Sequence, residues 1–236
     1  MELHNRVFGP VSLSAVLLAT AVGCVEVFLT LLELPFLVQS TGISRMDVFQ
    51  TFAFDPLDFR FRLEMASLFS DSLSLIGSSP FTLISYVFFH ANLTSAVFST
   101  VLILCIGSLL SRLAGNWLCL LTFFISAIVG GLAYSLLPSS AVFLVGSSPG
   151  ILGMFGLLAG LLLIAHGRGV AGASPAMIAL PFLLVGLTIV SDVIFGPAGY
   201  WAANATGFAV GLMLANLVVR GGLRATRTGL SRLFRD

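Results

Sequence analysis

Long apolar runs dominate this sequence and constrain its fold more than any other feature. Hydrophobic residues make up 58% of the 236 positions and charged residues only 9%, whereas roughly one quarter of a soluble domain is charged. Too little polar surface remains to cover a globule in water, so we expect the chain to lie in a bilayer. Crossing the hydrocarbon takes about 20 helical residues. Six runs are long enough, near residues 11–37, 81–110, 115–137, 148–166, 175–195 and 201–219. These predict an all-α membrane protein with a six-helix bundle.

The first run also resembles a secretory signal peptide, and Ala21 to Cys24 loosely resembles a lipoprotein cleavage site. However, the apolar run continues past Cys24 to about Leu37, where a processed lipoprotein would turn polar. We therefore interpret this run as a retained membrane helix.

The sequence indicates no cofactor, metal or nucleic acid. Its three cysteines, Cys24, Cys105 and Cys119, lie in apolar runs without disulfide or metal-ligand spacing, which favours small buried hydrophobic residues. The net charge of +1 gives no indication of nucleic-acid binding. We expect no cofactor and no bound metal.

The distribution of arginine predicts the orientation in the membrane. One side receives most of them: Arg6, Arg112, Arg168, Arg220, Arg224, Arg227, Arg232 and Arg235. The opposite side has only Arg45, Arg60 and Arg62, which acidic residues outnumber. The positive-inside rule therefore predicts that both termini are cytoplasmic, and we expect the bacterial inner (plasma) membrane.

The connections predict two further regions. The first outer loop, residues 41–79, interleaves phenylalanines with charges and predicts an amphipathic segment lying in the outer interface. We divide the chain into a membrane domain, residues 1–219, and an Arg-rich cytoplasmic tail, residues 220–236. Anionic lipid headgroups are the default contact of such a tail.

Three carboxylates fall within the predicted spans, where ionisable groups indicate function by default. Glu33 and Asp192 lie close enough to an interface to be hydrated. Glu26 lies seven residues before Glu33 and thus on the same helix face. Glu26 is either protonated or paired with a polar group on a neighbouring helix or partner, and the sequence leaves both alternatives open.

A Gly-x-Ser-x-Gly pattern, Gly146 to Gly150, opens the fourth run and places Ser148 at the start of a helix. A serine there can be a nucleophile, or it can cap the helix. The following Pro149 favours the cap, with serine as N-cap and proline at the first helical position. A soluble hydrolase elbow also fits the local string. It fails because no acid and histidine follow in suitable positions.

Two other stretches place polar groups near the end of the bundle where Ser148 is expected. His90 precedes Ser95 and Ser99 at +5 and +9, near the second run, and Asn204 lies in the sixth. Small residues four apart let helix backbones approach closely, and such contact between the fourth and sixth helices would bring Ser148 and Asn204 together. The candidate packing glycines are Gly146, Gly150, Gly153, Gly156, Gly160, Gly207 and Gly211.

Together these motifs resemble the rhomboid family of intramembrane serine proteases over nearly the whole chain. That family has a six-helix core, a long first outer loop and a Gly-x-Ser nucleophile motif opening the fourth helix. It also has a catalytic histidine before Gly-xxx-Gly in the sixth helix and a His-xxxx-His-xxx-Asn run on the second. The resemblance implies that Ser148 and Asn204 occupy the dyad positions and that His90 keeps the first histidine of the run. It implies that Ser95 and Ser99 replace the second histidine and the oxyanion-site asparagine.

The departures from the family pattern fall where the chemistry would be. An asparagine amide has no basic site near neutral pH, and loss of the base costs a serine protease on the order of 10⁶ in turnover. Each lost oxyanion donor costs a further factor of roughly 10²–10³, and Pro149 removes a backbone donor. His90 is the only histidine that could approach Ser148.

The resemblance therefore implies a pseudoprotease that binds transmembrane helices of client proteins without cleaving them. Polar groups at Ser95, Ser99, Ser148 and Asn204 would leave a small hydrated cavity, with a client helix held between the second and fifth helices. Two alternatives remain open: an active intramembrane protease with Ser148 and an unusual base, and a fixed accessory subunit of a larger membrane complex.

Overall fold

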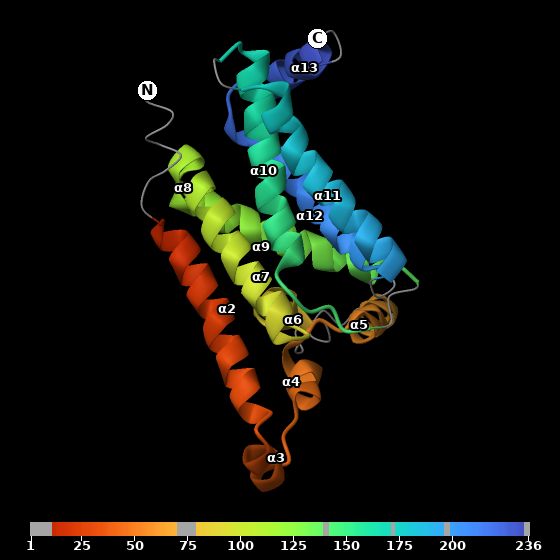
Figure 1. Ribbon diagram of the computed structural model, residues 1–236. Helices are drawn as coiled ribbons and strands as arrows, with labels where there is room; N and C mark the ends of the chain where they lie inside the picture. The colour runs from red at the N-terminus through yellow and green to blue at the C-terminus, as the bar shows by residue number, and fades with distance from the viewer. Residues whose placement is uncertain (1–10, 70–78, 139–141, 171–172, 196–198, 234–236) are drawn as a thin grey trace.

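The computed structural model describes residues 11–69, 79–138, 142–170, 173–195 and 199–233, and these are mostly helical (Figure 1). Within these ranges the extended backbone contributes one isolated antiparallel bridge, between Phe54 and Leu144. The helices of the first half are α2 (Leu13–Leu32), α3 (Pro35–Thr41), α4 (Arg45–Phe52), α5 (Pro56–Phe69), α6 (Ser79–Ser85), η2 (Tyr86–Phe88), α7 (Leu93–Leu102), η3 (Ile103–Gly107) and α8 (Ser108–Ala114). Those of the second half are α9 (Asn116–Ser135), α10 (Ser148–Gly167), α11 (Pro175–Phe195), α12 (Tyr200–Val218) and α13 (Gly222–Leu233).

Six spans in these ranges are long and apolar enough to cross a membrane, which confirms the predicted count. They are α2, the continuous run from α7 through η3 to α8, and α9, α10, α11 and α12. The helix α13 packs against the end of α10 and lies at one end of the bundle (Figure 1). Figure 1 shows α3 and α4 at the other end.

Two predicted boundaries are wrong. The first span ends at Leu32, because Pro35 starts a separate short helix and proline cannot continue the hydrogen bonding of the one before it. The second span begins at Leu93 rather than at residue 81. The side chain of Asn92 accepts a hydrogen bond from the backbone of Ser95 at 2.9 Å and caps α7. His90 therefore lies in the connection just before this span.

The fourth span, α10, forms the centre of the bundle. Its best membrane-spanning window is 78% buried within the protein, against at most 50% for the other five. Glycine makes its contact with α12 possible. A Cβ built on Gly211 would lie 1.8 Å from the carbonyl oxygen of Gly153, and one on Gly156 would lie 2.0 Å from that of Phe208. The two backbones therefore touch, which no larger residue at these positions allows.

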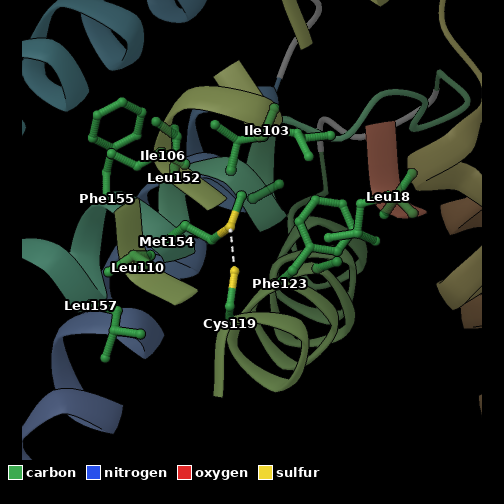
Figure 2. Packing of buried hydrophobic residues seen from close by; sticks show 14 of the residues in the cluster. Leu18, Ile103, Ile106, Leu110, Cys119, Phe123, Leu152, Met154, Phe155 and Leu157 are labelled. Atoms are coloured by element: carbon green, nitrogen blue, oxygen red, sulfur yellow. Dashed lines mark hydrogen bonds between the residues drawn. The ribbon is translucent and has the colours of Figure 1, made fainter. Parts of the chain in front are cut away.

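The apolar core surrounds α10. In Figure 2 the side chain of Cys119 on α9 points toward Met154 on α10, and the two sulfur atoms lie 3.6 Å apart. Cys119 is fully buried, as expected from the sequence. That expectation is wrong for Cys24 and Cys105, which are exposed on α2 and η3. Both lie on spans, where the bilayer rather than the protein covers an apolar surface.

The first outer loop forms the short helices α4 and α5 over residues 45–69, while residues 70–78 of that predicted loop lie outside the described ranges. Arg45 at the start of α4 resolves the alternatives for Glu26. Its guanidinium lies 2.9 Å from Glu26 and 2.9 Å from Glu33, the two carboxylates on one face of α2. Glu26 is paired with a group from α4, the short helix that lies between the first two spans in the sequence, not with a residue of a neighbouring span.

Candidate functional site

A sharp turn precedes α10. Gly146 has φ of +104°, a conformation that residues with a Cβ rarely adopt. Ser147 is the N-cap residue, although its side chain makes no capping hydrogen bond, and Ser148 is the first residue of the helix. The sequence interpretation placed the cap at Ser148 and was one residue too late. Ser148 therefore lies in the first turn, where backbone N–H groups have no partner within the helix.

Four segments hold the chain that leads into this turn. Leu144 exchanges two backbone hydrogen bonds with Phe54, and the backbone N–H of Gly146 donates to the carbonyl of Tyr86 at 3.1 Å. The hydroxyls of two tyrosines hold the residues that precede this turn. That of Tyr134 donates to Val142 at 2.8 Å, and that of Tyr200 donates to Phe143 at 2.5 Å. The position of the serines is thus set by groups outside α10.

The histidine of this region faces Ser147 instead of Ser148. Nε2 of His90 lies 3.3 Å from the hydroxyl oxygen of Ser147, and the two residues are only 1% and 0% exposed. Its Nδ1 is buried and has no hydrogen-bond partner among the described residues. Burial, with a smaller contribution from the charge of Arg45, lowers the pKa of His90 to about 4. The ring is therefore neutral at pH 7.

Arg45 also contacts this connection. Its Nη1 donates to the backbone carbonyl of His90 at 2.7 Å, while the same guanidinium binds Glu26 and Glu33. One side chain thus joins α4, α2 and the segment that carries the histidine. A charged donor strengthens such a hydrogen bond, so the backbone at His90 is held firmly.

Ser148 is half-buried and lines a hollow of about 250 Å³. Among the described residues its side chain makes no hydrogen bond. The surface exposed in the hollow is mainly apolar, and its other lining residues are His90, Ala91, Ser95, Ser99, Val145, Gly146, Ser147 and Tyr200. The hydroxyl of Ser95 donates to the carbonyl of Asn92 at 2.9 Å. The Ser95 hydroxyl is thus already hydrogen-bonded within its own turn.

Asn204 contacts the fifth span. Its Nδ2 donates to a carboxylate oxygen of Asp192 at 2.5 Å, and its Oδ1 is buried without a hydrogen-bond partner in the described part of the chain. The structure thus gathers His90, Ser95, Ser99 and Ser148 around one hollow, whereas the Asn204 amide joins α12 to α11. No hydrogen bond joins Ser148 to Asn204 in the described ranges.

The site holds one buried hydroxyl–imidazole pair, Ser147 with His90. Among the described residues, the hydroxyls of Ser99 and Ser148, which also line the hollow, make no hydrogen bond. In the described ranges no group of three His, Cys, Asp or Glu side chains could hold a metal ion. The arrangement can therefore donate and accept hydrogen bonds, and among the described residues no histidine is hydrogen-bonded to Ser148.

Comparison with known families decides the relationship. The family model of the Rhomboid domain matches residues 78–221, which is more than half of the chain and runs from α6 through α12. The chain belongs to the rhomboid family. It is an integral membrane protein with the six apolar spans of this rhomboid fold. No curated protein matches the chain.

Sequence reasoning did not single out three of the residues that shape this rhomboid site. Ser147 was passed over because the family pattern points to the next residue. Arg45 was counted only as a charge of the outer side, and Asp192 only as a hydrated carboxylate. Asp192 lies twelve residues before Asn204, across the connection between two spans, so the pair gives no periodic signal in the sequence. The buried Glu26 was the one sequence feature that required a partner such as Arg45.

Proposed function

We propose that this rhomboid-family protein is a pseudoprotease that binds transmembrane helices of other membrane proteins without cleaving them. The proposal rests on the side-chain amide of Asn204. This amide occupies the position of the family's catalytic base, has no affinity for the proton of a hydroxyl, and donates to Asp192. Neutral His90 bonds to the buried Ser147, so it is not directed at Ser148.

The space for a client helix supports this function. A cavity of about 280 Å³ opens between the second span, the central α10 and the fifth span α11. Its lining is apolar: Ile106, Leu109, Leu113, Phe155, Leu158, Leu162, Met177, Leu180 and Pro181. The window of α11 is only 17% buried within the protein, the lowest value of the six. A client side chain can enter this cavity, while the end of its helix reaches the hollow beside Ser148.

A serine-directed fluorophosphonate tests whether the protein retains a nucleophile. We expect no labelling of the purified, folded protein under conditions that fully label an active serine hydrolase. The variants Ser148→Ala and Ser147→Ala should behave as the wild type does. Labelling that disappears in Ser148→Ala would overturn the proposal.

A second candidate function, hydrolysis through Ser147, is favoured by the 3.3 Å contact with His90. A neutral imidazole at that distance can take a hydroxyl proton. The complete burial of the hydroxyl argues against it, because an attacked carbonyl must come within van der Waals distance. The same experiment separates the two, since labelling lost only in Ser147→Ala would establish this activity.

We also propose that the end of the bundle carrying α13 faces the cytoplasm of a bacterial cell. Arginines are concentrated at that end, which agrees with the positive-inside rule. The chain contains no lysine, so trypsin cuts it only after arginine. Trypsin should remove the region around Arg224 in inverted membrane vesicles and leave it intact in spheroplasts. The opposite pattern would reverse the orientation.

A further inference from the structure

The short helix α13 packs closely against the end of α10 through glycine. A Cβ on Gly167 would lie 1.9 Å from the carbonyl oxygen of Ala225, and one on Gly229 would lie 2.4 Å from that of Leu163. Arg232 adds a hydrogen bond to the carbonyl of His166 at 3.0 Å. Figure 1 shows α13 lying across the end of the bundle. The helix is therefore held as part of the folded protein.

The face of α13 that points away from α10 combines arginine with leucine. Arg224 and Arg227 are exposed, and within the described ranges neither makes an ion pair or a side-chain hydrogen bond. Leu223 and Leu230 are 72% and 41% exposed. Positions 223, 227 and 230 are four and three residues apart, so they lie on one side of the helix. No acidic residue occurs between positions 220 and 233.

We infer that α13 is an interfacial helix that binds the surface of an anionic lipid bilayer. Leu223 and Leu230 enter the boundary between acyl chains and headgroups, and Arg224 and Arg227 contact lipid phosphates. Interfacial helices bind bilayers in this way, with leucine at the acyl boundary and arginine at the headgroups. Charge complementarity selects the partner, because this face offers cations and hydrogen-bond donors with no carboxylate beside them.

The proposal predicts a preference for anionic over zwitterionic lipid. Each arginine near an anionic surface contributes about 1 kcal/mol, or roughly fivefold in affinity. The full-length protein in neutral detergent is titrated with phosphatidylglycerol and, separately, with phosphatidylcholine, and retained lipid is counted by native mass spectrometry. We expect wild type to retain phosphatidylglycerol preferentially. The double variant Arg224→Gln/Arg227→Gln should require roughly thirtyfold more of it.

The control is Arg62→Gln, which removes one arginine charge from α5 at the other end of the protein, where Arg62 pairs with Asp58. It should retain phosphatidylglycerol as wild type does. Leu223→Ser/Leu230→Ser should also weaken retention, because a bilayer surface, unlike free phosphate, needs the apolar side. Glycerol phosphate in solution should not displace the lipid. Equal melting temperatures of all variants in neutral detergent would verify that they are folded.

Four results would overturn the inference. The first is equal retention of phosphatidylglycerol by the wild type and the double arginine variant, and the second is equal retention of phosphatidylcholine and phosphatidylglycerol by the wild type. An equal loss in Arg62→Gln would show a general effect of charge. Displacement by glycerol phosphate, with no effect of the leucine changes, would show an anion site instead of a bilayer surface.

Discussion

Nη2 of Arg45 lies 2.9 Å from Oε1 of Glu26, so an ion pair joins α4 to the first span. The two side chains are 12% and 3% exposed. A buried carboxylate in a span is costly unless a cation accompanies it. The same guanidinium binds Glu33 and the carbonyl of His90. The pair therefore fixes α4, the first span and the wall of the hollow relative to one another.

Replacing Arg45 by methionine should lower the free energy of unfolding by about 3 kcal/mol, because Glu26 then stays buried without its cation. Arg62→Met, which breaks the half-exposed pair with Asp58, should cost less than about 1 kcal/mol. Unfolding in mixed micelles measures both. Arg45→Met/Glu26→Leu should recover most of the lost stability. Equal costs for the two single variants would show that burial of the pair does not matter.

A single methyl group at Gly211 should disrupt the contact between α10 and α12. The Cβ would lie 1.8 Å from a backbone oxygen, which cannot move without shifting a helix, and we expect Gly211→Ala to cost about 3 kcal/mol. Gly186 on α11 provides the matched control, since its Cβ would meet nothing within 4 Å. Gly186→Ala should be neutral or stabilise the protein by up to about 1 kcal/mol. Thermal melting of both variants is the measurement, and a similar melting temperature for the two would contradict the packing described.

The fold was largely predictable from the sequence, because span number depends on apolar length. The glycines at 153, 156, 207 and 211 lie where α10 and α12 touch, since close helix contact requires small residues at regular spacing. The start of the second span was not predictable from hydropathy. Residues 81–89 are as apolar as a span, yet the Asn92 cap and the short helices before it depend on local hydrogen bonds.

The partners of the site residues were less predictable. Which of two adjacent serines meets His90 depends on the turn at Gly146, and a shift of one residue at a helix start rotates a side chain by about 100°. The pairing of Asn204 with Asp192 requires the relative placement of two helices. The sequence shows residue types and leaves this placement open.

The hydrogen bond between Asn204 and Asp192 should stabilise the attachment of α11. Asp192→Leu leaves the buried Asn204 amide unpaired and should cost about 1–3 kcal/mol. In Asp192→Leu/Asn204→Leu most of this cost should disappear, because both polar partners are then gone. Unfolding free energies of the wild type, both single variants and the double variant form the cycle. Strictly additive costs would mean that the two side chains are not coupled, and faster amide exchange in α11 of Asp192→Leu is an independent readout.

Stability should fall in acid because of His90. Its pKa is about 4 in the folded protein and about 6.5 in an unfolded chain. The unfolded state thus binds the proton first, so the stabilisation is complete above pH 6.5 and is lost as the pH falls toward 4. Between pH 7 and pH 4 the wild type should lose roughly 3 kcal/mol more than His90→Gln does. Parallel pH profiles for the two proteins would exclude this role of His90, and between pH 8 and pH 7 both profiles should be flat.

The turn before Ser148 is held by Phe54, Tyr86, Tyr134 and Tyr200, and none of these is a member of the family's dyad. The architecture around the serine is therefore independent of the groups that would carry out proteolysis. A substitution at Ser148 or Asn204 therefore leaves the backbone of this turn in place, because its hydrogen bonds come from four other segments of the chain.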